Sequence, residues 1–348
     1  MLRFGLTRNY SEVPAKSVFV SVIVAARNEA DTILDCLISL AQLDYPENLI
    51  EIIIVNDRSE DATEAIIDQF IAEKACFKNI TIAEPVSTLS GKASAISQAV
   101  EQSQGEIIFV TDADCIVPSD WIKQMSRYFA EDVGMVAGFT LLRDTVGWWH
   151  LIQNLDLAYL LGVAAGAARL GIPLTCMGNN FAFRRSAYQQ IGGYRGVGFS
   201  VTEDFALLRS MSRKTDWKIR FLVDRNSLVK TRPVMNWREF LNQRKRWAVG
   251  GRNVHWFGKL LIMINLMSSA ILVALIFLGE NWGRFFGFSA FIFAGDYLLL
   301  AAVEKRLDSQ LNLAMIPLYR LFFIAYSVIL IFNLLLNRKV TWKGIEYR

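Results

Sequence analysis

Three apolar segments near the end of the chain limit what it can fold into. They cover residues 260–279, 285–303 and 313–336, and each is close to the ~20 residues that a helix needs to cross a bilayer. Inside a bilayer the backbone must satisfy its own hydrogen bonds, which favours helices. The sequence therefore predicts a membrane domain over residues 259–337, followed by a basic tail over residues 338–348.

The number of crossings stays open at this point. The second segment contains Asp296, and the third contains Pro317 and Arg320, so either segment can be tilted, re-entrant or partly buried in protein. Three full crossings would place the basic tail on the opposite side from the basic residues before the first segment. That arrangement goes against the positive-inside rule, whereas two crossings plus a re-entrant piece do not. The sequence therefore predicts two to three transmembrane helices without deciding between these numbers.

A basic cluster precedes the first apolar segment and suits an anionic cytoplasmic leaflet. A solvated helix face is the alternative, and nucleic-acid binding is not expected because no aromatic residues alternate with these charges. The cluster consists of Arg232, Arg238, Arg244, Lys245, Arg246, Arg252 and Lys259.

The residues before the membrane domain show a different pattern. Short β-branched apolar runs at 18–26, 51–55, 80–83 and 107–110 alternate with stretches of helical spacing. Such a rhythm predicts an α/β fold with a mostly parallel sheet covered by helices on both faces. Residues 148–170 form a further apolar stretch, interrupted by polar residues, which we interpret as an interfacial or cleft-lining helix, or equally as a core helix.

Acidic residues stand where the predicted strands end. Asp112 and Asp114 close the fourth strand, and ligands collect at the carboxyl ends of parallel strands. The chain has two histidines and four scattered cysteines without CxxC spacing, so a metal here must be held by oxygen, which favours Mg²⁺ or Mn²⁺. No GxGxxG or GxxxxGK[ST] motif occurs, which leaves Lys92 at a helix start as the candidate phosphate contact.

Several short strings stand in a recognisable order along the chain. They are Val24–Glu29, Val55–Asp61, Gly91-Lys92, Asp112–Asp114, Gly178–Asn180, Thr202–Asp204 and Gln243–Trp247. In this order they resemble the family 2 glycosyltransferases, inverting enzymes with the GT-A fold, and the resemblance covers most of residues 18–250. It implies a GT-A (Rossmann-like) nucleotide-sugar domain over residues 18–258, after an N-terminal segment of residues 1–17.

The resemblance also implies roles for individual residues. Asp114 would ligate the metal, and Asp204 would be the catalytic base. The donor nucleotide-sugar would be bound by Ala26, Glu29, Asp57, Lys92, Asp112, Gln243, Arg246 and Trp247. The acceptor side would include Gly178, Asn179, Asn180 and Glu203.

Local structure offers simpler explanations for some of these residues. Asp61 can cap the helix that follows it, and Glu203 with Asp204 can stabilise the positive end of a helix. Gly178 and Asn179 are also ordinary turn formers. Gln243, Arg246 and Trp247 fall on one face of an amphipathic helix predicted over residues 236–250, which on its own indicates only a membrane-surface element.

Together these features predict a metal-dependent glycosyltransferase that is integral to the cytoplasmic (inner) membrane, with its catalytic domain in the cytosol. It would move a sugar from a nucleotide-sugar, UDP-hexose or UDP-N-acetylhexosamine, to a membrane lipid or lipid-linked hydroxyl. The alternatives are a processive polysaccharide synthase and, in another class, a non-catalytic nucleotide-sugar-binding membrane scaffold. Residues 1–17 are too polar for the amino-terminal membrane helix that some lipid-directed family members have.

Overall fold

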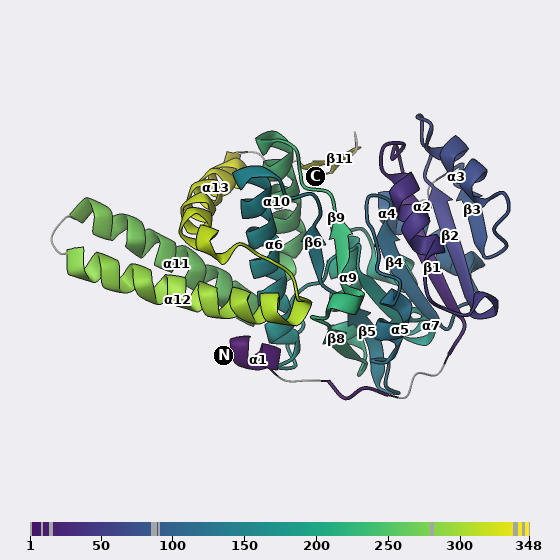
Figure 1. Ribbon diagram of the computed structural model, residues 1–348, viewed down its shortest axis with the longest axis horizontal. Helices are drawn as coiled ribbons and strands as arrows, with labels where there is room; N and C mark the ends of the chain where they lie inside the picture. The colour runs from purple at the N-terminus through teal and green to yellow at the C-terminus, as the bar shows by residue number, and fades with distance from the viewer. Residues whose placement is uncertain are drawn as a thin grey trace. The chain divides into compact units, whose positions relative to one another are not determined.

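The computed structural model describes residues 2–7, 10–13, 17–84, 89, 91–278, 282–336, 340–342 and 345–347. The chain forms two compact units, each assembled from separate stretches of sequence (Figure 1). We call Arg8–Arg143 with Thr175–Arg232 the sheet unit. We call Met1–Thr7, Asp144–Leu174 and Pro233–Arg348 the helical unit.

The sheet unit is built on a seven-stranded sheet with the order β3-β2-β1-β4-β7-β5-β8. Only β7 runs antiparallel to its neighbours, so the predicted mostly parallel α/β sheet is confirmed. The strands are β1 (Val20–Ala26), β2 (Ile50–Asn56), β3 (Phe77–Thr81), β4 (Ile107–Asp112), β5 (Val133–Ala137), β7 (Phe181–Arg184) and β8 (Lys218–Phe221). A small parallel pair joins β6 (Thr140–Leu142) to β9 (Val229–Thr231).

Helices cover both faces of this sheet, as apolar strands require. On one face Val22 and Val24 of β1 share a core with Leu37 and Ile67 from two helices. On the other face Ile23 is equally buried, and a third helix packs on β1 and β2. The helices of this unit are α2 (Ile33–Ala41), α3 (Thr63–Ile71), α4 (Gly91–Gln102), α5 (Trp121–Ser126), α7 (Arg185–Gln190), α8 (Gly193–Val197) and α9 (Glu203–Lys214), with short turns η1 (Glu47–Leu49) and η2 (Arg225–Ser227).

The helical unit contains four helices that are long and apolar enough to cross a membrane, within the described part of the chain. Three of them match the segments predicted from sequence, and the fourth is the stretch predicted as an interfacial or core helix. The unit's elements are α1 (Leu2–Thr7), α6 (Gly147–Ala168), α10 (Trp237–Gly250), η3 (Gly251–Asn253), α11 (Trp256–Leu278), α12 (Trp282–Leu307), η4 (Leu313–Met315), α13 (Ile316–Leu336), β10 (Val340–Trp342) and β11 (Ile345–Tyr347).

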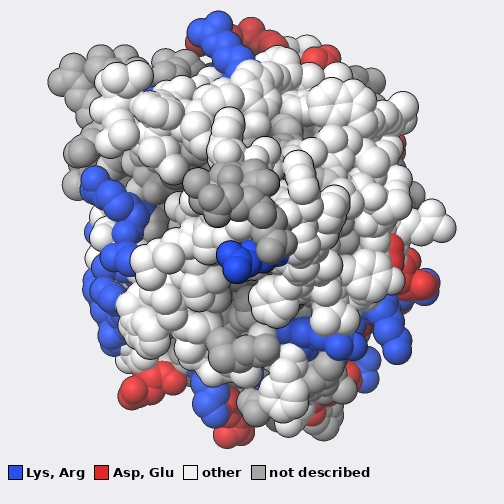
Figure 2. All heavy atoms as spheres, turned by 90° about the vertical axis from the view of Figure 1, so that its left-hand side faces the viewer, with Lys and Arg blue, Asp and Glu red and all other residues white. Residues whose placement is uncertain are grey.

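Helix α6 is the most buried of these four helices, and α1, α12 and α13 pack against it. By contrast, α11 and α12 form an antiparallel pair (Figure 1), and most residues in the apolar stretches of both helices are not buried. Uncharged side chains dominate the face shown in Figure 2, as expected for a surface that meets lipid tails.

The units do not follow a single boundary along the sequence. We expected one boundary near Lys259, but the contacts group residues 144–174 and 233–258 with the apolar helices. The physical reason lies in the apolar helix α6, which packs against α1, α12 and α13 within this unit.

Two members of the predicted basic cluster lie inside the helical unit rather than on a solvated face. Arg244 and Lys245 are buried, with exposed fractions of 7% and 6%. Arg244 forms an ion pair with Asp156, and Lys245 donates a hydrogen bond to Asn333. The cluster therefore offers fewer charges to an anionic leaflet than the sequence suggested.

The charged residues in the predicted membrane segments also have partners. Arg320 of α13 forms a bidentate ion pair with Asp296 of α12 and donates to Asn265 of α11 over 2.6 Å. Pro317 lies in the first turn of α13, where a missing N–H costs nothing. The described residues of the three predicted segments are helical, and the third segment begins with the short turn η4 before α13.

Candidate active site

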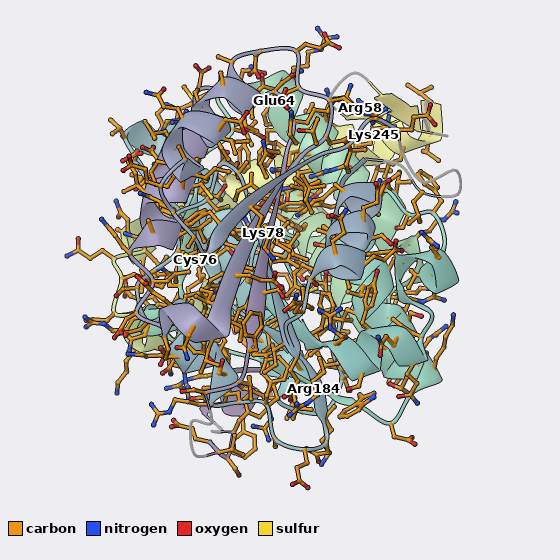
Figure 3. The ribbon with its side chains drawn as sticks, turned by 90° about the vertical axis from the view of Figure 1, so that its right-hand side faces the viewer. Arg58, Glu64, Cys76, Lys78, Arg184 and Lys245 are labelled. Carbon is orange, nitrogen blue, oxygen red and sulfur yellow. The ribbon has the colours of Figure 1, made fainter. Side chains whose placement is uncertain are left out.

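The carboxyl ends of β1, β2 and β4 lie side by side at one edge of the sheet. In the strand register Ala26 is opposite Asn56, and Ala25 is opposite Asp112. Figure 3 shows Arg58, just beyond β2, towards one end of the sheet and Arg184, which ends the antiparallel β7, towards the other. The parallel pairing therefore gathers the predicted donor residues that follow these three strands at a single edge.

The loops after β1 and β2 hold each other in place. Asn28 and Arg58 both adopt the left-handed backbone region, with φ of 53° and 55°. The Asn28 amide donates to Ser59 Oγ over 3.1 Å, and the Glu60 amide donates back to Asn28 Oδ1 over 2.8 Å. The Glu29 amide donates to Thr63 Oγ1 over 2.8 Å. Mutual bonding of this kind fixes Glu29 beside the end of β2 and offsets the cost of the two strained residues.

The two aspartates of the second loop have different surroundings. Asp57 is buried, and its carboxylate forms an ion pair with the neighbouring Arg58 over 2.9 Å. Asp61 Oδ1 accepts from the amide of Thr63, the first residue of α3, over 3.0 Å. Asp61 therefore supports the helix start, as its position in the sequence suggested, whereas Asp57 stands at the strand end.

Lys92, on α4, connects the acidic residues from several elements. Its ammonium group forms ion pairs with Asp112 and, over 3.4 Å, with Glu203, and it donates to the Gly178 carbonyl over 2.6 Å. Burial alone would lower the pKa of Lys92, but the negative charges of Asp112 and Glu203 outweigh it and raise that pKa. The lysine is therefore a fixed positive charge beside Asp112, as a diphosphate contact requires.

Asp114 lies in an acidic environment that a divalent cation would neutralise. Burial and the negative charges of Asp112 and Glu29 raise the pKa of Asp114, although Thr231 Oγ1 and Cys115 Sγ donate to it over 3.1 and 3.3 Å. Oxygen donors without histidine fit Mg²⁺ or Mn²⁺. No group of three or more His, Cys, Asp or Glu side chains in the described ranges is arranged to hold a metal, so a cation at Asp114 would need further oxygens from other protein groups, a substrate or water.

In the turn before β7, Gly178 lies beside charged side chains and Asn180 lies in the core. We call Lys92, Asp112, Asp114, Glu203 and Asp204 the acidic cluster. Gly178 faces it, because a Cβ placed there would lie 3.0 Å from Lys92 Nζ and 3.1 Å from Asp204 Oδ2. Asn180 lies in the core, where Trp121 Nε1 donates to its Oδ1 and its Nδ2 donates to the carbonyls of Phe139 and Ser227.

Asn179 is also buried, and it accepts from Thr140 Oγ1 over 2.9 Å and donates to Cys115 Sγ. We predicted both asparagines at the acceptor side. Asn180 is fully buried and its amide bonds hold this turn, and the acceptor-side role of both asparagines stays a prediction.

Glu203 and Asp204 occupy the first turn of α9, where the helix dipole favours negative charge. Asp204 Oδ1 accepts from the Phe205 amide over 2.7 Å, and Asp204 Oδ2 faces Gly178. The helix-start explanation therefore applies to both acids, and the role of Asp204 as catalytic base stays a prediction. The hydrogen bond at the helix start fixes the orientation of Asp204, and its Oδ2 lies on the same side of Gly178 as Lys92 Nζ.

Gln243, Arg246 and Trp247 belong to α10 in the helical unit. A single helix runs through all three residues, so they lie on one helix face, as their spacing predicts. Their role towards a donor stays a prediction.

Sequence reasoning missed several residues of the site. Thr231 donates to Asp114 from 117 positions away in the chain, and no pattern around it signals that contact. Arg58 was overlooked as the partner of Asp57, although its position directly after the strand end was a usable signal. The four cysteines are free thiols, and Cys115 and Cys36 lie beside the acidic cluster.

Comparison with known proteins finds matching family models and a similar fold. The family model "Glycosyl transferase family 2" matches residues 21–192, and "Glycosyl transferase family group 2" matches residues 107–336. A mannosyltransferase from Pyrobaculum calidifontis, solved with GDP-Man and Mn²⁺, superposes with a TM-score of 0.62 over 96% of this chain and 92% of its own, at 17% identity. That likeness shows a shared fold.

Two curated relatives are similar over about two thirds of this chain or more. The beta-monoglucosyldiacylglycerol synthase of Synechocystis sp. is 30% identical across 71% of this chain and 50% of its own length. The poly-beta-1,6-N-acetyl-D-glucosamine synthase of Staphylococcus epidermidis is 29% identical across 68% of this chain and 55% of its own. The chain thus spans about half the length of the curated relatives it matches.

Proposed function

Because the chain belongs to glycosyl transferase family 2, we propose that it moves a sugar from a UDP-sugar onto a hydroxyl of a membrane lipid or lipid-linked acceptor. The reaction is a single inverting displacement at the cytoplasmic face of the inner membrane. Similarity to the beta-monoglucosyldiacylglycerol synthase supports a lipid acceptor. The four apolar helices support a membrane location.

One observation carries this proposal. Asp112, Glu203 and the carbonyl of Gly178 converge on Lys92, with Asp204 against the same glycine, although these groups come from four distant parts of the chain. A fold that needed these acids only for helix starts and turns would not bring them together around one buried ammonium. Their convergence fits a site that handles the charge of a nucleotide diphosphate.

In the proposed mechanism each part of the donor meets a separate group. Glu29 and Asp57 hold the uracil and ribose, and Arg58 keeps Asp57 in place until the nucleotide arrives. Asp112 and Lys92 contact the sugar and diphosphate, and Asp114 would hold Mg²⁺ or Mn²⁺. When bound, that ion stabilises the negative charge that develops on the leaving UDP.

The acceptor is activated by Asp204. Its carboxylate takes the proton of the acceptor hydroxyl as the new bond from that oxygen to the anomeric carbon forms and the bond to the UDP oxygen breaks. One carboxylate suffices, because an inverting displacement has a single step. Gln243, Arg246 and Trp247 would close over the diphosphate and the acceptor.

A processive polysaccharide synthase is the second candidate. The Gln243–Trp247 string and the similarity to the Staphylococcus epidermidis synthase favour it. The two candidates differ in the length of the product. A non-catalytic scaffold is a third possibility, which would bind nucleotide without transfer.

A donor panel tests the proposal. The purified full chain would receive membrane lipid extract, Mn²⁺ and one radiolabelled donor at a time, taken from several UDP-sugars and GDP-mannose, with thin-layer separation of the products. We expect one labelled glycolipid from a UDP-sugar. A polymer ladder would support the synthase, and nucleotide binding without any transfer would support the scaffold.

A further inference from the structure

A buried ion pair anchors α10 within the helical unit. Arg244 Nε donates to Asp156 Oδ2 of α6 over 2.9 Å, and Nη2 lies 2.6 Å from the same oxygen. The two side chains are 8% and 7% exposed. Burying such a pair costs desolvation energy that its attraction only partly offsets, so its presence says little about stability and invites a functional explanation.

Arg244 also holds two residues that the sequence assigns to the donor. Its Nη1 donates to Gln243 Oε1 over 2.7 Å. Its guanidinium group lies over the Trp247 ring at 4.3 Å and over the Phe240 ring at 4.4 Å. One planar cation therefore fixes both the amide orientation of Gln243 and the ring of Trp247.

Asp156 is held in turn by a third helix. Tyr326 of α13 donates to Asp156 Oδ1 over 3.0 Å, and its ring contacts Phe240 edge-on at 5.4 Å. Both carboxylate oxygens of Asp156 are thus occupied, one by Arg244 and the other by Tyr326. Two apolar helices therefore determine how the Gln243–Trp247 face of α10 is presented.

We propose that Arg244 and Asp156 are positioning residues, which orient Gln243 and Trp247 for the nucleotide diphosphate. This inference rests on the proposed function, in which those two side chains contact the donor. Neither Arg244 nor Asp156 touches the reacting atoms themselves. Arg244 acts through its hydrogen bond and ring contact, and Asp156 acts by holding the guanidinium plane.

The other buried pair of the unit supplies a matched control. Asp296 and Arg320 are as deeply buried, and their recorded partners lie on α6, α11, α12 and α13 rather than on α10. An Arg→Lys change keeps the positive charge at either site but removes the planar fork of donors. Only at position 244 does that fork reach Gln243.

The experiment compares Arg244→Lys with Arg320→Lys in the full chain. Calorimetry would measure the affinity for UDP and for GDP in the presence of Mn²⁺, and thermal unfolding would report integrity. We expect Arg244→Lys to unfold close to the wild-type temperature but to bind the nucleotide about tenfold more weakly. Transfer assays should show a raised donor KM with a smaller change in kcat.

Asp156→Asn keeps the size and one acceptor oxygen of the side chain, so it serves as a second variant if Arg244→Lys does not fold. It should also weaken nucleotide binding, whereas Arg320→Lys should leave it unchanged. Wild-type affinity in folded Arg244→Lys, or an equal loss in Arg320→Lys, would overturn the positioning role alone. A wild-type protein that binds neither nucleotide would overturn the proposed function as well.

Discussion

At the scale of single residues, the arrangement of charges in the site depends on Gly178, which has no Cβ. Gly178 is packed so closely that a Cβ would lie 3.0 to 3.2 Å from Lys92 Nζ, Asp204 Oδ2 and Glu203 Oε1. These are the ends of flexible side chains, which can shift by a few tenths of an ångström without unfolding the protein. A methyl group at position 178 would therefore displace these three charged groups rather than unfold the protein.

Gly178→Ala should consequently reduce sugar transfer at least about tenfold while the unfolding temperature changes little, because a displaced general base loses much of its contribution. Activity and thermal unfolding of the same preparation check this. Gly287→Ala is the control, since its Cβ would enter open space. Equal activity in the two variants would show that the packing at Gly178 does not matter for turnover.

Asp114 supports a second prediction at this scale. Because no cluster of three His, Cys, Asp or Glu side chains occurs among the described residues, we expect tight metal binding to need the diphosphate as well. Electron paramagnetic resonance of free Mn²⁺ should show strong uptake by the wild type only when UDP is added. Asp114→Asn should abolish that uptake, and retention at wild-type affinity would remove Asp114 as a ligand.

At the scale of elements, the sequence predicted what contiguous patterns can encode. The runs that became β1, β2 and β4 are almost entirely apolar, and their predicted bounds agree with the structure to within two residues. For β3 the prediction of residues 80–83 was displaced from Phe77–Thr81. This strand lies at the edge of the sheet, and only Phe77 is buried, so no continuous apolar run marks it.

Contacts between residues that are far apart in the sequence could not be predicted from it. From the sequence Arg244 looked like part of a basic cluster that meets an anionic leaflet, because its partner Asp156 lies 88 positions earlier. Thr231 beside Asp114 gave no signal for the same reason. The strand-end acids Asp112 and Asp114 were predictable, since parallel pairing alone brings strand ends together.

Glu51 of β2 supports a prediction on how elements are joined. Its buried carboxylate accepts from Ser21 Oγ and the Gln104 amide and pairs with Lys78 over 2.8 Å, linking β1, β2, β3 and the end of α4 (Figure 3 labels Lys78). Burial alone would raise the pKa of Glu51, but these partners lower it below its usual value. A lowered pKa means that the ionised form stabilises the fold.

That contribution is complete above the unfolded-state pKa of about 4.3 and is lost as the pH falls through the lower folded-state pKa. Glu51→Gln should therefore destabilise the protein by about 1–3 kcal/mol at pH 7. The difference from wild type should shrink at pH values below ~4. Chemical denaturation followed by circular dichroism at several pH values measures this, with the exposed Glu106→Gln as control. A deficit that stayed constant down to pH 3 would contradict the assignment.

At the scale of the whole molecule, charged side chains help to assemble apolar helices. Arg320 joins α11, α12 and α13 through Asn265 and Asp296. A buried charge without its partner is costly, whereas removing both charges need not be.

Arg320→Ala should therefore destabilise the chain by about 3–5 kcal/mol, and Asp296→Leu with Arg320→Met should recover most of that loss. Thermal unfolding in detergent, with size-exclusion profiles, compares the three proteins. If Arg320→Ala is as stable as the wild type, the ion pair has no role in assembly. If the double variant is no more stable than Arg320→Ala, removing both charges does not restore stability.

Sugar transfer by the reconstituted protein tests the central claim most directly. Wild type and Asp204→Asn would be placed in liposomes of membrane lipid with the radiolabelled UDP-sugar that the donor panel selects, and labelled lipid would be counted over time. We predict that the variant binds UDP like the wild type but transfers sugar about 10²- to 10⁴-fold more slowly. Transfer at the wild-type rate would contradict the assignment of this acidic cluster as the site of glycosyl transfer.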